Sequence, residues 1–171
     1  MKLEQINECM KMILKPSRYL HCVGVEEVAC DLAAIYGYNM EKASIAEILH
    51  DCAKNLAEPE LLDICANYHI PVSEVEKKCV FLLHAKVGAL YARSKYGIED
   101  DEIQNAILYH TTGRPAMALL EKIIFTADYI EPYRGTLPRI DEIRKAAYSD
   151  LDLGVYMILE NTLNYLKNTG I

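Results

Sequence analysis

Four of the five histidines lie among apolar residues at the spacing of a helix face. These four are His21, His50, His84 and His110. His110, for example, follows Ile107 by three residues and Ile103 by seven, and residues at such offsets share one side of a helix. The spacing therefore predicts four imidazoles that point into the core. The fifth, His69, lies between two predicted helices, and we expect it to be exposed.

Two aspartates are expected in the same region. Asp51 directly follows His50 near the end of a predicted helix, and Asp128 follows Ile124 by four residues. An unpaired carboxylate in apolar surroundings would cost several kcal/mol, so it must be protonated, paired or bound to a metal. Adjacent residues on a helix point about 100° apart. His50 and Asp51 can therefore face one cluster, with Asp51 bridging two ions and His50 binding one of them.

Taken singly, each histidine is explained more simply as a core residue with satisfied hydrogen bonds, and Asp128 as a buried salt-bridge partner. These simple explanations do not account for the four histidines and two aspartates together, because ordinary hydrophobic cores do not contain so many titratable groups. Packed imidazoles without a ligand would also leave ring nitrogens without partners. The six residues therefore predict a two-metal site.

The donor set also indicates the metal and the chemistry. Imidazole ligands favour Fe, Mn, Co or Zn over Mg, which prefers oxygen. Two divalent ions bound by two carboxylates have an excess positive charge of about +2, which attracts phosphate. Water bound to such ions can also lose a proton at neutral pH, which gives a bound hydroxide. Residue chemistry alone thus predicts a two-metal hydrolase that acts on an anionic substrate.

Three basic residues are placed to assist this chemistry. Arg18 precedes His21 by three residues, Lys54 follows Asp51 by three, and Arg134 lies in a loop after Asp128. In the predicted mechanism Asp51 orients the attacking hydroxide, and the three cations offset charge on the phosphates. The alternatives are a solvated arginine at a helix start and a lysine that satisfies a helix dipole.

Two further kinds of residue are candidates for substrate contact. Gly24 and Gly88 lie inside predicted helices, where glycine costs about 1 kcal/mol relative to alanine. We attribute Gly24 to close approach of a ligand and Gly88 to tight helix packing. Thr111 follows His110 directly and can hydrogen-bond substrate, as can Thr112. The expected substrate contacts are Arg18, His21, Gly24, Asp51, His84, His110, Thr111, Asp128 and Arg134.

The elements that position these residues are all predicted to be helices. Apolar spacing, prolines and glycines predict helices at about 16–36, 41–52, 59–68, 84–96, 99–110, 116–129, 141–148 and 151–167. Ser73 and Glu76 form a capping box for a further short helix. No alternating stretch is long enough for a sheet, and no repeat is present. We predict a single all-α domain, a compact helical bundle over residues 1–171. The asparagines of the last helix are most simply the polar side of an amphipathic element.

The composition of the chain limits the kinds of partner that we expect it to bind. The 171-residue chain is 51% hydrophobic with a net charge of −7, and no Lys/Arg run exceeds two residues, which argues against nucleic acid. No apolar stretch is long enough for a membrane span, and the first dozen residues lack the core of a signal peptide. The six cysteines form no CxxC pair, so we expect free thiols in a cytoplasmic protein.

The order of the six site residues resembles the binuclear form of the HD-domain superfamily. Four blocks, LKPSRYLH (14–21), LHDCAK (49–54), HTTG (110–113) and ADYIEP (127–132), resemble the YqeK-type proteins. The similarity spans nearly the whole chain. It implies the helical HD fold, a di-iron centre and symmetrical hydrolysis of diadenosine tetraphosphate, a small-molecule nucleotide, to two ADP molecules.

Three alternatives stay open at this point. The nearest is another HD phosphohydrolase acting on mononucleotides or cyclic dinucleotides. A second is a mixed-valent di-iron oxygenase with the same ligand pattern, and a third is a nucleotide-binding regulatory module without turnover. The sequence also leaves open whether the chain is a monomer or a homodimer.

Overall fold

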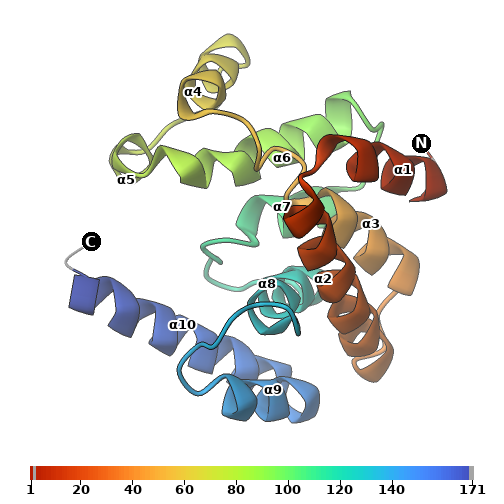
Figure 1. Ribbon diagram of the computed structural model, residues 1–171, viewed down its shortest axis with the longest axis vertical. Coiled ribbons are helices and arrows are strands. Elements are labelled where there is room, and N and C mark those ends of the chain that lie inside the picture. The colour runs from red at the N-terminus through yellow and green to blue at the C-terminus, as the bar shows by residue number, and fades with distance from the viewer. Residues whose placement is uncertain (2, 170–171) are drawn as a thin grey trace.

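The computed structural model describes residue 1 and residues 3–169 (Figure 1). These residues form ten α-helices and one short 3-10 helix, and no strand occurs among them. The elements are α1 (Leu3–Ile13), α2 (Pro16–Ile35), α3 (Met40–His50), α4 (Glu58–Asn67), α5 (Glu74–Lys78), η1 (Val80–Leu82), α6 (Leu83–Ser94), α7 (Asp101–Tyr109), α8 (Leu119–Ile130), α9 (Ile140–Ser149) and α10 (Leu151–Thr169). The predicted all-α fold is therefore confirmed.

Most helix boundaries match the predictions, and the differences have local causes. The Ser73–Glu76 capping box at the start of α5 is present as predicted. The predicted start of the 116–129 helix is wrong, because Ala116 has a φ of 56° and α8 begins only at Leu119. The helix expected to run to residue 52 ends at His50, which makes Asp51 its C-cap. Helices α1 and η1 were not individually predicted.

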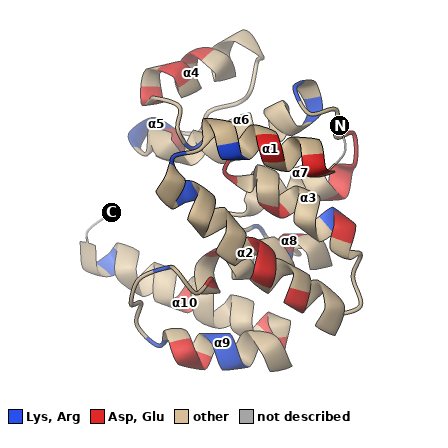
Figure 2. Cartoon of the chain, turned by 45° about the vertical axis from the view of Figure 1, so that its right-hand side comes forward, with Lys and Arg blue, Asp and Glu red and all other residues tan. Residues whose placement is uncertain are grey.

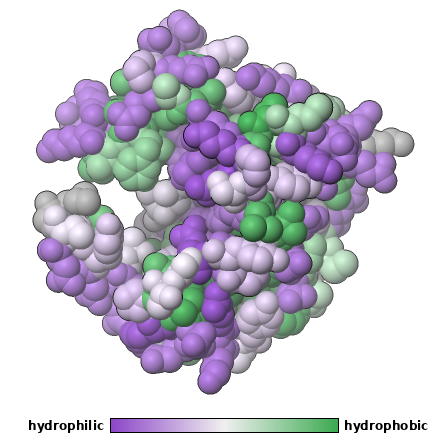
Figure 3. Space-filling model, viewed as in Figure 1, coloured by the Kyte–Doolittle hydropathy of each residue, from purple (hydrophilic) through white to green (hydrophobic). Residues whose placement is uncertain are grey.

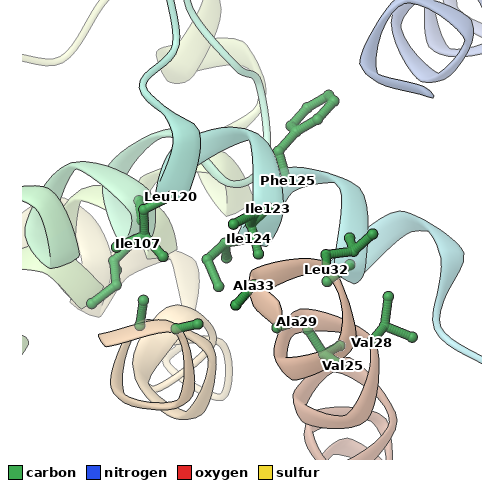
Figure 4. Close-up of a cluster of buried hydrophobic side chains, with 14 of the residues drawn as sticks. Val25, Val28, Ala29, Leu32, Ala33, Ile107, Leu120, Ile123, Ile124 and Phe125 are labelled. Atoms are coloured by element: carbon green, nitrogen blue, oxygen red, sulfur yellow. The ribbon is translucent and has the colours of Figure 1, made fainter. Parts of the chain in front are cut away.

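The main hydrophobic core surrounds α8. In Figure 4, Ile124 of α8 lies between Ile107 of α7 and Ala33 of α2, and all three side chains are fully buried. Helix α3 packs against both α2 and α7, so the four helices enclose one apolar interior. A smaller cluster, which includes Leu61 and Leu83, joins α4 to α6. This packing fixes the helices whose ends carry the predicted site residues.

The surface of the protein carries charges of both signs. Acidic and basic residues are interspersed over the helices, so the face seen in Figure 2 is not uniformly basic. No helix among the described residues has both the length and the apolar character needed to cross a membrane. All six cysteines are free, and Cys22, Cys52 and Cys65 are buried. His69 is exposed, as predicted.

Candidate metal centre

Asp51 lies at the centre of a cluster of imidazoles. Its side chain is only 3% exposed. Oδ2 lies 3.9 Å from Nε2 of His21 and 3.7 Å from Nε2 of His50. Oδ1 lies 3.3 Å from Nε2 of His84 and 3.7 Å from Nε2 of His110. One carboxylate oxygen thus faces one pair of histidines, and the other oxygen faces the second pair.

Asp128 completes the set from the side of His21. Its Oδ1 lies 3.1 Å from Nε2 of His21 and 2.7 Å from a guanidinium nitrogen of Arg134. The imidazoles also contact one another edge to face, with the rings of His50 and His110 5.0 Å apart. The structure therefore brings together all six residues proposed as ligands, from α2, α3, α6, α7 and α8.

Backbone carbonyls fix the tautomer of three of these histidines. Nδ1 faces the carbonyl oxygen of the residue three positions earlier, at 2.5 Å in His84, at 2.7 Å in His110 and in close contact in His50. A carbonyl oxygen only accepts, so each Nδ1 carries the ring proton and donates it. Each Nε2 is then left with a lone pair directed at Asp51, which is the form that binds metal.

The Glu131 carboxylate fixes the tautomer of His21 in the same way. Its Oε1 accepts from Nδ1 of His21 at 3.1 Å, and its Oε2 accepts from the backbone N–H of Tyr133 at 2.5 Å. Glu131 is 1% exposed, so this hydrogen bond is shielded from water. Sequence reasoning missed its role. Glu131 is the C-cap of α8, so its place against His21 is set by the path of the chain after the helix and not by helical spacing.

Burial and neighbouring charges shift the pKa values of the cluster residues in different directions. Burial lowers the pKa of His50 to about 4 and also lowers the pKa of His84. Burial opposes the charged form of His21, but the nearby carboxylates of Asp128, Glu131 and Asp51 raise its pKa. For Asp51, burial is outweighed by the surrounding imidazoles and Lys54, which hold the pKa of its carboxyl well below its usual range.

The cluster fits a divalent metal ion because it is a collection of acceptors. Among the described residues, buried polar atoms without a hydrogen-bond partner include Nε2 of His21, Nε2 of His50 and Oδ1 of Asp51. An ionised carboxylate facing imidazole lone pairs is costly to bury unless a cation joins them. Ligand atoms of His21, His50 and Asp51 lie within 4.8 Å of one another, as do those of Asp51, His84 and His110. The two groups share Asp51.

Three basic side chains stand around the cluster, as predicted. Arg18 lies 2.8 Å from Oδ2 of Asp51, and Nζ of Lys54 lies 3.1 Å from Nε2 of His84 and 3.7 Å from Oδ1 of Asp51. Arg134 pairs with Asp128. The side chains of Arg18, Lys54 and Arg134 are 33%, 30% and 32% exposed. They therefore border the cluster while remaining open to solvent.

The two threonines after His110 differ in position. Oγ1 of Thr111 lies 3.0 Å from Nε2 of His110 and 3.3 Å from Nε2 of His84, so it touches the cluster directly. Thr112 is exposed, and its hydroxyl donates to the carbonyl of Gly113. Of the two, only Thr111 contacts the histidine cluster.

The close neighbours of Gly24 in the structure are residues of the chain itself. A Cβ at Gly24 would lie 2.8 Å from Oε2 of Glu131 and 2.8 Å from the ring of Tyr133. The group that approaches this glycine is therefore the chain's own segment after α8, which also places Glu131 against His21. Gly88 does serve helix packing, because a Cβ there would lie 3.3 Å from the side chain of Ile107.

The last helix anchors the loop after α8. Asn161 donates to the carbonyl of Pro138 at 2.6 Å and to the hydroxyl of Tyr129 at 3.2 Å. Asn164 and Asn168 are exposed on the outer side of α10. The asparagine that contacts other elements thus has a structural partner, in agreement with a closing helix.

A helical fold that gathers histidines and aspartates around one shared carboxylate is the arrangement of an HD-domain protein. The HD domain family matches residues 18–133, so the chain belongs to this family. Within it, the chain is 42% identical over 166 residues to the symmetrical bis(5'-nucleosyl)-tetraphosphatase of Bacillus subtilis (strain 168). The alignment covers 97% of this chain and 88% of that relative.

Other relatives agree with this placement. The symmetrical bis(5'-nucleosyl)-tetraphosphatase of Staphylococcus aureus is 38% identical over 173 residues, covering 100% of this chain and 88% of the relative. A crystal structure from Clostridium acetobutylicum, described as a predicted HD superfamily hydrolase involved in NAD metabolism, superposes with a TM-score of 0.95 at 40% identity. That match covers 99% of this chain and 89% of the other. The predicted resemblance is confirmed.

Proposed function

We propose that residues 1–171 act as one HD-type domain that hydrolyses diadenosine tetraphosphate symmetrically to two ADP molecules. The histidine–aspartate cluster would hold two divalent metal ions for this reaction, and iron is the ion that we expect. The ligands are His21, His50, Asp51, His84, His110 and Asp128. The names of the relatives support the substrate, and the donor set of four imidazoles supports a transition metal such as iron.

The observation that carries this proposal is the position of Asp51 between two pairs of histidines. Its two oxygens face separate pairs, so a single carboxylate can serve two ions. Divalent ions in such a centre polarise phosphate oxygens and supply an activated water at neutral pH. Asp51 would orient that water toward phosphorus, and the buried carbonyl and carboxylate partners of the histidines hold the rings in place.

The basic residues bind the phosphates. Arg18 contacts Asp51 and Lys54 contacts His84, and both side chains would be free to bind phosphate if those two ligands held metal ions. Their one-third exposure lets them reach a ligand that enters from solvent. Arg134 stands beside Asp128, and there it binds a further phosphate oxygen. Charge-assisted hydrogen bonds from these groups stabilise the leaving diphosphate.

The test is metal content and turnover on one sample. The protein is produced in iron-supplemented medium under low oxygen, metals per chain are determined, and products of diadenosine tetraphosphate are separated by ion exchange. We expect about two metals per chain and ADP as the only nucleotide product. AMP with ATP would contradict symmetrical cleavage, and metal without turnover would contradict the substrate. A chain that takes up no metal on reconstitution would overturn the metal centre itself.

A further inference from the structure

An arginine of α9 holds the chain where it leaves α8. Helix α8 ends at Ile130, and Glu131 is its C-cap. Nε of Arg144 donates to the carbonyl oxygen of Ile130 at 3.0 Å, and a second guanidinium nitrogen donates to that of Glu131 at 3.1 Å. The carbonyls at the end of a helix have no partner within the helix, so donors must come from elsewhere. Arg144 therefore fixes the direction in which the chain turns after α8.

The segment held in this way makes two contacts with the metal centre. The carboxylate of Glu131 accepts from Nδ1 of His21 at 3.1 Å, and Arg134 lies 2.7 Å from Oδ1 of Asp128. The backbone N–H of Arg134 donates to the carbonyl of Glu131 at 3.3 Å, so this turn is tied to the same carbonyl that Arg144 binds. Arg144 thus holds the backbone of Glu131, and the side chain of Glu131 holds His21.

The two carbonyl contacts distinguish Arg144 from an arginine that only pairs with surface charge. Its ion pair with Asp141 is 3.5 Å long, and Asp141 is 86% exposed. Exposed pairs of this kind contribute little to stability. Glu27 and Asp31 line a cavity of about 220 Å³ together with Arg144, but in the described part of the chain neither carboxylate hydrogen-bonds to it. The guanidinium is therefore directed at the end of α8.

Helix α9 has other contacts that keep it in place. Ile143, Ala146 and Ala147 are buried, and the hydroxyl of Tyr36 on α2 donates to the carbonyl of Ala147 at 2.7 Å. The lower edge of the molecule in Figure 3, where α9 lies in Figure 1, is mostly hydrophilic. The helix thus has one apolar side toward the core and one polar side toward solvent. Loss of the Arg144 side chain should therefore leave α9 folded and packed.

We infer that Arg144 is a positioning residue of the metal centre, although it contacts none of the six proposed ligands within the residues that the structure describes. It acts through the backbone of Glu131, whose carboxylate then meets Nδ1 of His21 and leaves Nε2 for the metal. This inference rests on the metal centre proposed above. It gives α9, which lies outside the matched HD-domain residues 18–133, a part in building the site.

Metal affinity in a double-mutant cycle tests the inference. Co²⁺ is the probe, because imidazole ligands suit it, and its affinity is measured in competition with a chelator of known affinity. Arg144→Met removes both donors and should weaken Co²⁺ binding by about tenfold, the lower end of the range for loss of a partner behind a ligand histidine. Removal of a positive charge would by itself strengthen the binding of a cation, so a loss of affinity indicates an effect of position.

The Glu131→Gln background separates positioning from stability. Glutamine keeps the backbone carbonyl that Arg144 binds but no longer supplies a carboxylate to His21. In this background Arg144→Met should lower the urea midpoint of the metal-stripped protein as much as it does in the wild-type protein. It should cause no further loss of Co²⁺ affinity. If Arg144→Met weakens Co²⁺ binding equally in both backgrounds, Arg144 does not act through Glu131 and the inference is overturned.

A charge-matched variant and a control complete the experiment. Arg144→Lys keeps the positive charge and a donor for the carbonyls, so it should bind Co²⁺ more tightly than Arg144→Met. Arg139→Met removes an arginine at the start of the same helix whose side chain donates to Glu142 and Glu160, and it should keep the wild-type affinity. A Co²⁺ affinity of Arg144→Met equal to or above that of the wild-type protein would overturn the inference. So would an equal loss in Arg139→Met, because the effect would then be common to α9.

Measurement of Co²⁺ affinity needs no substrate, which separates this inference from the proposed reaction. If the wild-type protein binds Co²⁺ but does not cleave diadenosine tetraphosphate, the proposed substrate fails while the role of Arg144 stands. If the wild-type protein binds no Co²⁺, the proposed metal centre fails and the inference fails with it.

Discussion

Replacing Glu131 by glutamine tests whether the buried carboxylate behind His21 prepares that ring for metal. Glutamine has nearly the size of glutamate, but one of its two terminal groups is an NH2 donor. In the structure both oxygens of Glu131 accept, one from Nδ1 of His21 and one from the backbone N–H of Tyr133. Either orientation of the amide therefore places a donor against a donor.

The expected sizes of the changes in stability and in metal affinity follow from these two contacts. If NH2 faces Tyr133, a buried N–H loses its acceptor, which costs about 1–3 kcal/mol of stability. If NH2 faces His21, Nδ1 must accept, and the ring proton moves to Nε2, the atom that lies 3.1 Å from Asp128. Loss of such a partner behind a ligand histidine weakens metal binding by about 10–100-fold. An imidazole can shift its ring proton whereas the backbone N–H of Tyr133 cannot become an acceptor, so the second orientation is favoured and we expect Glu131→Gln mainly to weaken metal binding.

The assay measures the two effects separately. Metal affinity is obtained by competition with a chelator of known affinity, and the free energy of unfolding is obtained by urea titration of the metal-stripped protein. Glu121→Gln is the matched control. Glu121 is 2% exposed and accepts from Arg114 at 2.7 and 2.6 Å, but neither residue belongs to the six proposed ligands. In this control the free energy of unfolding should fall by about 1–3 kcal/mol, and the metal affinity should stay unchanged.

Two results would refute the reasoning. If Glu131→Gln binds metal as tightly as the wild-type protein, the carboxylate has only a structural role. If Glu121→Gln loses metal affinity to the same extent as Glu131→Gln, the effect arises from general destabilisation and not from the tautomer of His21.

Four further outcomes are expected. Asp51→Ala should abolish turnover and reduce the metals bound per chain while circular dichroism shows an unchanged helical content. Chelation of the wild-type protein should lower its melting temperature, because ions that bind only the folded state stabilise it, and added metal should restore the original value. Gly24→Ala should weaken metal binding in the same chelator competition, since its Cβ would lie 2.8 Å from Oε2 of Glu131. Gly154→Ala should lower the free energy of unfolding, measured by urea titration, by about 1–3 kcal/mol and leave kcat unchanged. The reason is that its Cβ would lie 2.8 Å from Cα of Ala147, where α9 and α10 meet.

The fold was predictable where apolar residues recur over several helical turns, and less so at the helix ends. The repeats in α2 and α8 identified both helices, because burial requires them to present one apolar side. The predicted start of α8 is too early, because the residue type of Ala116 does not reveal its left-handed backbone conformation. The end of α3 was placed too late, although this end decides where Asp51 points.

The proposed ligands were predictable because histidine and aspartate are unusual on apolar helix faces. Glu131 and Gly24 were not predictable in their roles, because both depend on where the segment after α8 lies against α2. An acidic residue followed by Pro132 at a helix end also suits an exposed turn. Only the tertiary contact with His21 distinguishes the two possibilities.

The helix ends explain why the cluster forms where it does. The last four carbonyls of a helix have no partner within it. In α3 and α7 one of these carbonyls, three residues before His50 and His110 respectively, accepts the Nδ1–H of the histidine. Each ring therefore caps its own helix and, through the same hydrogen bond, turns Nε2 toward Asp51. Because the C-terminal end of a helix carries a partial negative charge, both helix ends also favour a cation at this position. The backbone and the six side chains thus select the same kind of ligand.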